Sequence, residues 1–466
     1  MAQAHLDRLT SIDAGFLHQE DGGAHMHIGG LGVFNGPPPT GSAFREHIAA
    51  RLALVPRYRQ KLVQMPLGSG RPLWAEDPGF NIDYHVRHTA LPSPGTEDQL
   101  MTLASRIASQ RLDRTKPLWE LWLVEGLHDG RWAIISKTHH AMIDGVGGVD
   151  LLTALLDVTP ETRRLDPDDW EPQATPGPVG LLAHGAYGVA RNLGRLSAKG
   201  LGLAVHPQQA VREVLSTAAA LAAVGGPLLS SAPTTPLNRK PGPHRSVQLV
   251  RTELSDYKVV KKAFGATVND VVLAAVSGAL GRFLQDRGVD TQGLQLKACV
   301  PVSVRTSATT GAAGNEITIM TAPLPVGIAR PVERLALVRQ AMEHLKGSRQ
   351  AEGAKVMTSL ENALPPAVLA RASRLGFSSR LYNLLVTNVP GPQVPIYLLG
   401  SQLQELAPLA FLAPEHTLAI AIVSYNGAVT YGLLADSDAV PDLPQLAEHL
   451  RASLAELVAA ARVAAA

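Results

Sequence analysis

The sequence has one cysteine, little net charge and no long apolar run. The lone Cys299 excludes an intramolecular disulfide and fits a reducing compartment. A formal net charge of only +2 argues against a nucleic acid as the main partner. No apolar run reaches the ~20 residues of a membrane-spanning helix, and the nearest, 215–229, is interrupted by Gly225, Gly226 and Pro227. The first residues lack a basic region followed by an apolar stretch, so we expect no signal peptide and a cytoplasmic protein.

Length and composition predict two domains. A chain of 466 residues exceeds one ordinary hydrophobic core. The sequence becomes charged and proline-containing before residue 171, and residues 172–179 are rich in proline and glycine. We therefore expect an N-terminal domain at 1–165, a crossover linker at 166–246 and a C-terminal domain at 247–466.

Acidic residues are absent from 172–212. Arg191, Arg195 and Lys199 are spaced four apart there, so on a helix they would share one face. One interpretation is peripheral contact with an anionic membrane or lipid droplet, where each basic residue contributes about 1 kcal/mol. The other is a solvated crossover that packs on the second domain.

The most informative stretch is His139-His140-Ala141-Met142-Ile143-Asp144-Gly145. An apolar run at 132–136, which follows the turn pair Asp129-Gly130, predicts a strand and a hairpin before it, and 149–156 predicts a buried helix after it. Imidazole titrates near neutral pH and can accept a proton from a hydroxyl group. An aspartate followed by glycine would fix the turn. The alternatives are a metal-binding pair or two core histidines, but adjacent histidines chelate one metal poorly, so we expect no metal.

This His-His-x-x-x-Asp-Gly pattern resembles the signature of the CoA-dependent acyltransferase superfamily, whose fold is that of chloramphenicol acetyltransferase. The superfamily includes non-ribosomal peptide condensation domains and the bacterial wax ester synthase/diacylglycerol acyltransferases. Four further stretches resemble motifs of the latter family and occur in its order. They are 9–17, Pro117-Leu118-Trp119, the run 269–274 that begins Asn269-Asp270, and the turn 387–392.

The resemblance implies roles for particular residues. His140 would act as general base, His139 would support it, and Asp144 and Gly145 would hold the turn. Pro117, Leu118 and Trp119 would pack and shape the acyl channel.

Two further motif residues have candidate roles. Asn269 is a candidate oxyanion donor. Asp270 is spaced from Thr267 as in a capping box, so it could simply cap a helix. Arg305 is a candidate partner for an ion pair with either Asp144 or Asp270.

By resemblance, the fold is α/β (α+β), with two chloramphenicol-acetyltransferase-like domains and an active-site tunnel at their interface. The expected activity is transfer of a long-chain acyl group from acyl-CoA to diacylglycerol, without an acyl-enzyme and with no cofactor. A fatty alcohol acceptor, and hence wax ester synthesis, is the near alternative. Carrier-bound condensation is disfavoured by the other motifs. A non-catalytic lipid-droplet protein is the alternative from a different class.

Overall fold

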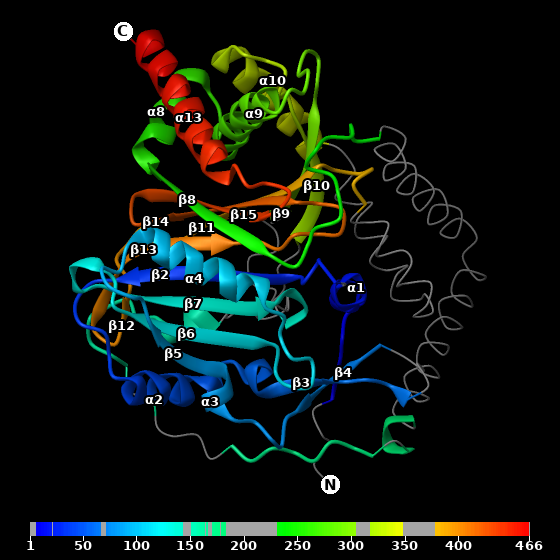
Figure 1. Ribbon diagram of the computed structural model, residues 1–466, viewed down its shortest axis with the longest axis vertical. Coiled ribbons are helices and arrows are strands. Elements are labelled where there is room, and N and C mark those ends of the chain that lie inside the picture. The colour runs from blue at the N-terminus through cyan, green and yellow to red at the C-terminus, as the bar shows by residue number, and fades with distance from the viewer. Residues whose placement is uncertain are drawn as a thin grey trace, which may run out of the picture.

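Two six-stranded sheets lie one above the other, with helices on their outer sides (Figure 1). The computed structural model describes residues 6–20, 22–66, 71–142, 151–163, 165, 170–177, 179–182, 231–303, 317–347 and 378–465. This is the mixed helix-and-sheet, two-domain architecture expected from the sequence.

The first sheet carries the histidine motif. Its strand order is β12 (Tyr397–Leu398), β13 (Ser401–Leu409), β2 (His27–Phe34), β7 (Trp132–His139), β6 (Trp119–Glu125) and β5 (Val86–Ala90). The pair β5–β6 is parallel and the other pairs are antiparallel. The predicted hairpin around Asp129 is present, because Asp129 and Gly130 both adopt positive φ between β6 and β7.

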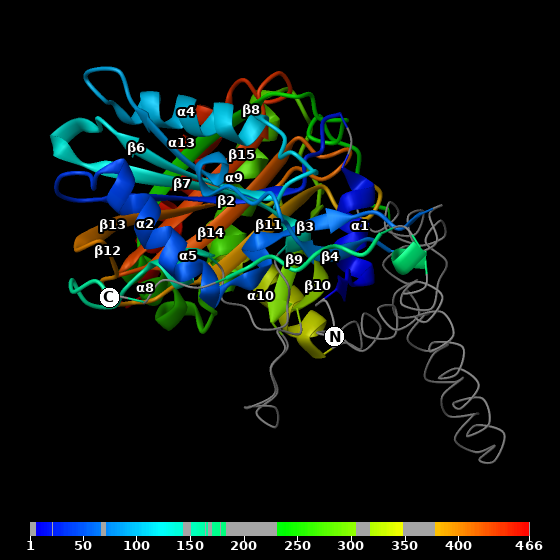
Figure 2. The same ribbon diagram turned by 90° about the horizontal axis from the view of Figure 1, so that it is seen from below.

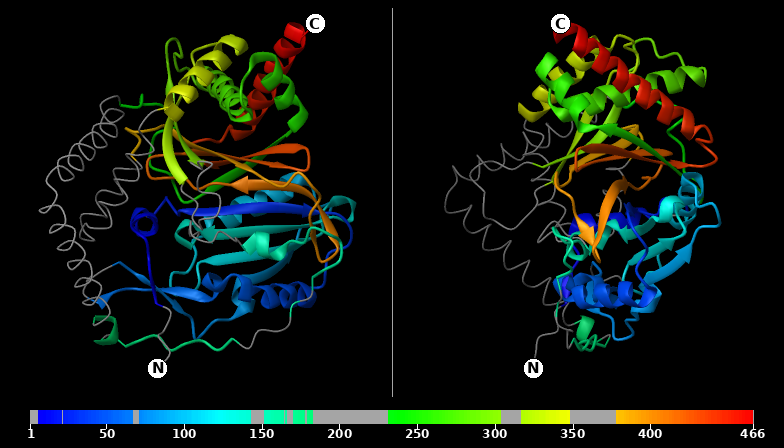
Figure 3. Two further views of the ribbon diagram at one scale, coloured as in Figure 1. Left: turned by 180° about the vertical axis from the view of Figure 1, so that it is seen from behind. Right: turned by 90° about the vertical axis from the view of Figure 1, so that its left-hand side faces the viewer.

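The second sheet is mixed. Its order is β10 (Ile317–Leu324), β9 (Leu296–Ser303), β11 (Leu384–Pro390), β14 (Leu418–Tyr425), β15 (Ala428–Asp436) and β8 (Arg245–Glu253). The Asn426-Gly427 pair forms the tight turn between β14 and β15, with φ of 44° and 87°. The helices α8 (Leu254–Phe264), α9 (Val268–Asp286), α10 (Pro331–Gly347) and α13 (Leu443–Ala465) cover its outer face (Figure 3).

Capping explains where two of the main helices begin. The helix α4 (Glu97–Ser109) starts with a capping box between Thr96 and Gln99, and α9 starts with one between Thr267 and Asp270. Around the first sheet, α2 (Gly41–Arg51) lies beside α5 (Leu151–Leu155) (Figure 2). The His47 ring contacts the Leu155 carbonyl at 2.9 Å. The remaining short elements are α1 (Ser11–Gln19), α3 (Ile82–His85) and a small sheet of β1 (Asp7–Arg8), β4 (Leu73–Glu76) and β3 (Gln60–Val63).

The two halves of the chain are interleaved. The strands β12 and β13 lie far along the sequence, yet β13 pairs with β2 and extends the first sheet. Where β13 approaches the second sheet, a Cβ on Gly432 would lie 1.7 Å from the Pro408 carbonyl oxygen, so only glycine fits. The sequence-based domain limits therefore do not describe which residues form each sheet, and the limits themselves stay a prediction.

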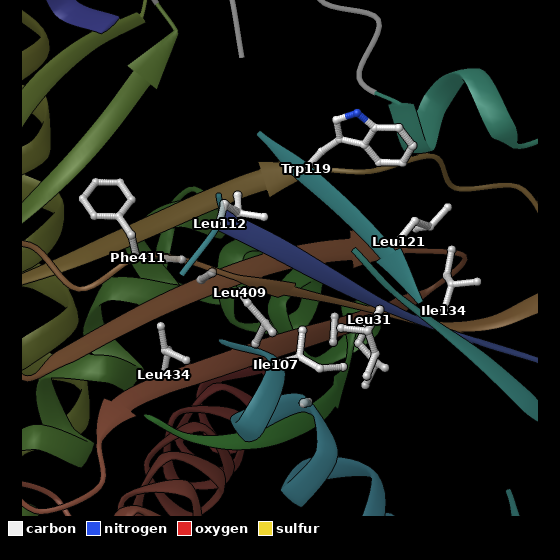
Figure 4. Packing of buried hydrophobic residues seen from close by; sticks show 14 of the residues in the cluster. Leu31, Ile107, Leu112, Trp119, Leu121, Ile134, Leu409, Phe411 and Leu434 are labelled. Carbon is white, nitrogen blue, oxygen red and sulfur yellow. The ribbon is translucent and has the colours of Figure 1, made fainter. Parts of the chain in front are cut away.

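The hydrophobic core runs across both sheets. Leu31 and Ile134 come from the first sheet and Leu434 comes from the second, with Ile107 of α4 between them (Figure 4). Within the described ranges, no single helix has the length and hydropathy of a membrane span. The pair α8 and α9 meets those criteria together but is bent by 101°.

Candidate active site

His140 begins a short 3₁₀ turn, His140–Met142, directly after β7. Its backbone N–H donates to the Met26 carbonyl at 2.9 Å, which ties the turn to the start of β2. The structure therefore places His140 at a strand end, as the sequence predicts. Asp144 and Gly145 lie outside the described residues, so their roles in the turn stay predictions.

Two aromatic rings hold the His140 side chain. The Phe16 ring stacks on it with centroids 4.1 Å apart, and the Phe411 ring meets it edge-on at 5.4 Å. Desolvation by these apolar surroundings lowers the pKa of His140 to about 4, and an interaction with its own backbone opposes the shift. The imidazole is therefore neutral at pH 7, and the residue as a whole remains partly exposed.

His139 faces a polar environment. Its Nδ1 accepts a hydrogen bond from the Ala141 backbone N–H at 3.1 Å, so the ring hydrogen must be on Nε2. That Nε2 lies 3.9 Å from the Glu20 carboxylate. Burial lowers the pKa of His139 to about 3, so this ring is also neutral. This geometry is how His139 would support the turn that carries His140.

Glu20 links three of the surrounding side chains. It accepts a hydrogen bond from Arg114 Nε at 2.6 Å, and its other oxygen lies 3.6 Å from His27 Nε2. His27 and His139 are directly opposite in the β2–β7 register, with ring centroids 5.7 Å apart. Among the described residues, no group of three or more His, Cys, Asp or Glu side chains is arranged to hold a metal ion.

A small cavity of about 30 Å³ lies beside this group, between the two halves of the chain. Met26 and Phe411, which both contact His140, are among its lining residues. Most of the wall is apolar, and the polar lining residues are His25, His27, Ser136, Lys137 and Arg245.

The two cationic groups in the cavity wall already have partners. Lys137 Nζ donates to the Ile107 and Gln110 carbonyls, each at 3.1 Å, and lies 3.1 Å from Glu120. Arg245 donates to the carbonyls of Gly23, Gly242 and His244 and lies 3.9 Å from Asp436. The cavity therefore offers apolar contact and neutral hydrogen-bonding groups rather than an anion site.

The Pro117-Leu118-Trp119 motif lies in the core. All three residues are buried, and Trp119 Nε1 donates to the Tyr58 carbonyl at 2.8 Å. The indole also stacks on His85 with centroids 4.6 Å apart. None of the three is among the described residues that line the cavity, and a role in an acyl channel stays a prediction.

Asn269 and Asp270 lie at the start of α9. Asp270 Oδ2 accepts the Thr267 backbone N–H at 2.8 Å, so Asp270 does cap the helix. Asn269 Oδ1 accepts a hydrogen bond from Asn388 Nδ2 at 3.3 Å, which connects two of the sequence motifs. Arg305 lies outside the described residues, so its pairing with Asp144 or Asp270 stays a prediction, as does the oxyanion role of Asn269.

Sequence reasoning missed five residues around the histidine pair: Phe16, Glu20, His25, His27 and Phe411. The close spacing of His25 and His27 was the one usable signal, although strand alternation does not relate them, because His25 precedes β2 and Met26 between them has a φ of 50°. Phe411 gave no local signal, since it comes from the loop after β13.

Known proteins show the same organisation. The family model for the wax ester synthase/diacylglycerol acyltransferase catalytic domain matches residues 9–272, over half of the chain, and the WS/DGAT C-terminal domain matches residues 313–458. The chain belongs to the wax ester synthase/diacylglycerol acyltransferase family. It is therefore an acyltransferase, and the family recognised from its motifs is confirmed.

Relatives of this acyltransferase cover nearly its whole length. A probable diacylglycerol O-acyltransferase from Mycobacterium tuberculosis (strain ATCC 25618 / H37Rv) is 32% identical over 97% of this chain and 96% of its own. The wax ester synthase/diacylglycerol acyltransferase from Marinobacter aquaeolei VT8 superposes with a TM-score of 0.69 and 25% identity, covering 98% and 99% of the two chains.

A more distant structure supports the fold alone. The starter condensation domain of rhizomide synthetase has a TM-score of 0.59 at 16% identity, over 98% of this chain and 94% of that one. The chloramphenicol-acetyltransferase-like fold expected for the acyltransferase is thus confirmed.

Proposed function

We propose that this acyltransferase moves a long-chain acyl group from acyl-CoA to the free hydroxyl of diacylglycerol, giving triacylglycerol. The observation that carries the proposal is a neutral imidazole, that of His140, held between Phe16 and Phe411 beside a mostly apolar cavity. The name of the Mycobacterium tuberculosis relative supports the acceptor.

In the proposed mechanism His140 is the general base. With the ring hydrogen on the buried Nδ1, Nε2 takes the proton from the acceptor hydroxyl as the oxygen attacks the thioester carbonyl. The new C–O bond gives a tetrahedral oxyanion, for which Asn269 is the proposed donor. The C–S bond then breaks, and the Nε2 proton passes to the CoA sulfur. Asp144 and Gly145 would hold the turn.

Direct transfer needs no acyl-enzyme. The lone thiol, Cys299, lies on β9 and is buried, and burial raises its pKa to about 12. A thiol that stays protonated is a poor nucleophile. We therefore propose that both substrates meet at His140 and that no cofactor is needed besides the acyl-CoA substrate.

We further propose that the protein acts in the cytoplasm, in peripheral contact with a membrane or lipid droplet. Both substrates are lipids, and the basic residues Arg191, Arg195 and Lys199 fall in a stretch without acidic residues. Replacing these three by glutamine should weaken co-sedimentation with anionic vesicles. Unchanged co-sedimentation would favour the solvated crossover instead.

The deciding experiment is a paired assay with radiolabelled palmitoyl-CoA. One reaction contains diacylglycerol and the other hexadecanol, and His140→Ala is compared with the control His449→Ala, a partly exposed histidine on α13 that pairs with Asp286. We expect labelled triacylglycerol from the native protein and a loss of at least about 10²-fold for His140→Ala, the lower range of general-base contributions. His449→Ala should retain activity.

The outcomes separate the alternatives. Product from hexadecanol as well would make the enzyme bifunctional. Product from hexadecanol alone would show that the acceptor is a fatty alcohol and not diacylglycerol. Normal turnover by His140→Ala would overturn the mechanism. Absence of transfer and of acyl-CoA binding would favour the non-catalytic lipid-droplet protein.

A further inference from the structure

The helix α1 carries one of the two aromatic rings that hold His140. Its Phe16 ring is buried and stacks on the His140 imidazole with centroids 4.1 Å apart. The helix has only nine residues, and a helix of that length is marginal in water unless the rest of the protein holds it. The place of Phe16, and with it the cover over His140, therefore depends on what holds α1.

The C-terminal end of α1 is held by Arg114. The last carbonyl groups of a helix lack partners within it, and Arg114 Nη2 donates to the Leu17 carbonyl at 2.9 Å. The same guanidinium donates from Nε to Glu20 Oε2 at 2.6 Å, and Glu20 caps this end of the helix. One side chain thus joins the carbonyl next to Phe16 and the cap residue.

The carboxylate that Arg114 binds is buried. The Glu20 side chain is 5% exposed, whereas that of Arg114 is 42% exposed. The nearby rings of His27 and His139 are neutral, because burial lowers the pKa of both, so they do not balance the Glu20 charge. A buried carboxylate needs a cationic partner, so the guanidinium keeps this end of α1 inside the protein.

The backbone around Arg114 is itself tied to the core. Asp113 Oδ1 accepts the N–H and the hydroxyl group of Thr115 at 2.8 and 2.7 Å, which closes a turn around Arg114. A few residues later, the carbonyl of the buried Leu118 accepts the His139 N–H at 3.0 Å. The turn that carries Arg114 is therefore connected to the strand that carries the histidine pair.

We propose that Arg114 is a positioning residue for catalysis: by binding the Leu17 carbonyl and the Glu20 carboxylate, it keeps Phe16 stacked on the His140 ring. The inference rests on the proposed role of His140 as general base. Arg114 acts through α1 and not on the substrate. A planar guanidinium can bind a carboxylate and a carbonyl at once, whereas a lysine ammonium is a point charge on a flexible stem. Arg114→Lys should therefore keep the charge but lose the fixed geometry.

The experiment compares Arg114→Lys with the control Arg287→Lys in the diacylglycerol assay. Arg287 also joins a carboxylate, that of Asp442, and a backbone carbonyl, that of Ala439, but it does so at the C-terminal end of α9. In Arg114→Lys we expect kcat to fall by about 10- to 10²-fold with little change in KM, since misplacement of a reacting group by about 1 Å can cost about 10²-fold. Arg287→Lys should have native kinetics.

The pH profile separates positioning from stability. The pKa of His140 is lowered by desolvation, so a ring that loses the cover of Phe16 should titrate closer to the ordinary value of about 6.5. We expect the acid limb of kcat/KM in Arg114→Lys to move up by about one pH unit or more. A purely structural role would lower the melting temperature and leave the acid limb in place. The variant leaves unchanged the titratable groups on the elements around His140, which are Asp13, His18, Glu20, His25, His27 and His139.

A double-mutant cycle with Phe16→Ala tests the route of the effect. If Arg114 acts through Phe16, the double variant should be no more than about twofold worse than Phe16→Ala, whereas independent roles multiply the two losses. If Arg114→Lys fails to fold, Arg114→Met/Glu20→Gln, in which no charge is left unpaired, is compared with Glu20→Gln. The same shift of the acid limb is then expected.

Three results would overturn the inference. Native kcat and a native acid limb in Arg114→Lys would show that Phe16 keeps its place without the guanidinium. A lower kcat with an unmoved acid limb, or losses that multiply with Phe16→Ala, would show that Arg114 acts by another route. Normal turnover by His140→Ala would overturn the proposed mechanism and the inference together, whereas an inactive His140→Ala beside a native-like Arg114→Lys would overturn the inference alone.

Discussion

His139 and His140 are neighbours in sequence but have different surroundings. The His140 ring lies between two phenylalanines, whereas His139 Nδ1 accepts the Ala141 N–H and His139 Nε2 lies 3.9 Å from the Glu20 carboxylate, beyond hydrogen-bond distance. A histidine that must exchange a proton needs a nitrogen that can reach the substrate, while a histidine that fixes a turn needs a bond to that turn. The different roles proposed for His139 and His140 follow from what each ring contacts.

Glu20 should therefore affect catalysis without touching the reacting atoms. In Glu20→Gln the carboxylate charge 3.9 Å from His139 Nε2 is lost, which weakens the electrostatic preference for a hydrogen on that nitrogen, while the Ala141 N–H still favours the same tautomer. We expect kcat to fall roughly tenfold, about 1.4 kcal/mol, with little change in KM, because His139 loses a nearby charge. Steady-state kinetics checks this, with the exposed Glu97→Gln as control. An unchanged kcat would show that the Ala141–His139 contact alone is sufficient.

The pH profile should report the burial of His140. Its pKa is lowered from 6.5 to about 4, so the neutral base persists well below the pH at which an exposed histidine protonates. We expect kcat/KM to lose activity on the acid side with an apparent pKa near 4 to 5. The range from pH 4 to 9 should be measured with stability controls. An acid limb centred at 6.5 would mean that the ring is solvated in the working enzyme.

The sequence predicted the histidine pair but not the residues that hold it. His139 and His140 share one local motif with a known chemistry. Phe16, Glu20 and Phe411 reach the site from α1, from the residue after it and from a loop much later in the chain. A single sequence shows each residue's local pattern, and these three contacts depend on the tertiary arrangement.

At the level of elements, α4 covers the edge of the second sheet. The strand β8 is at the end of the sheet, so one side of its backbone lacks a strand partner. Ser105 Oγ accepts the Val247 N–H at 3.0 Å, and Ser109 Oγ accepts the Arg245 N–H at 2.9 Å. Two serine hydroxyl groups about one helical turn apart thus accept hydrogen bonds from β8 that a neighbouring strand would otherwise accept.

Removing both hydroxyls should destabilise the protein. In Ser105→Ala/Ser109→Ala two backbone N–H groups lose their partners, and each such loss costs roughly 1–3 kcal/mol. Urea denaturation should show a lower midpoint than for the native protein. Thr102→Ala on the same helix is the matched control, because Thr102 is exposed and bonds only within α4. Equal midpoints for both variants would mean that water replaces the serines.

Short sequence patterns predicted individual helix starts and turns correctly where each pattern is specific to one structure. The capping box between Thr267 and Asp270 and the hairpin around Asp129-Gly130 are present as predicted. The pairing of β13 with β2 was not predictable, because a strand's alternation of residues does not identify its partner strand.

At the scale of the whole molecule, buried neutral histidines should make the fold sensitive to acid. The pKa values of His25 and His139 are lowered to about 4 and about 3, and that of His27 lies well below its usual value. Unfolding exposes these rings, which then bind protons below their unfolded pKa near 6.5. The stability they provide is complete above that pH and is lost as the pH falls towards the folded values.

Thermal unfolding should show this dependence. Between pH 6.5 and about pH 4, each histidine that gains a proton on unfolding lowers stability by about 1.4 kcal/mol per pH unit. We therefore expect the melting temperature to fall steadily below pH 6.5, and His25→Gln to flatten the slope. A melting temperature that stays constant down to pH 5 would contradict the burial of neutral rings.

The interleaving of β13 with β2 has a consequence for how the enzyme is made. A ribosome releases β2 and β7 early, but the strand that completes their sheet and the Phe411 ring that holds His140 emerge only near the end of synthesis. Until then the nascent chain has an open strand edge and an unfinished site. The enzyme is therefore expected to gain activity only after nearly all of the chain has been translated. Separate expression of the two halves should yield activity only if they are present together.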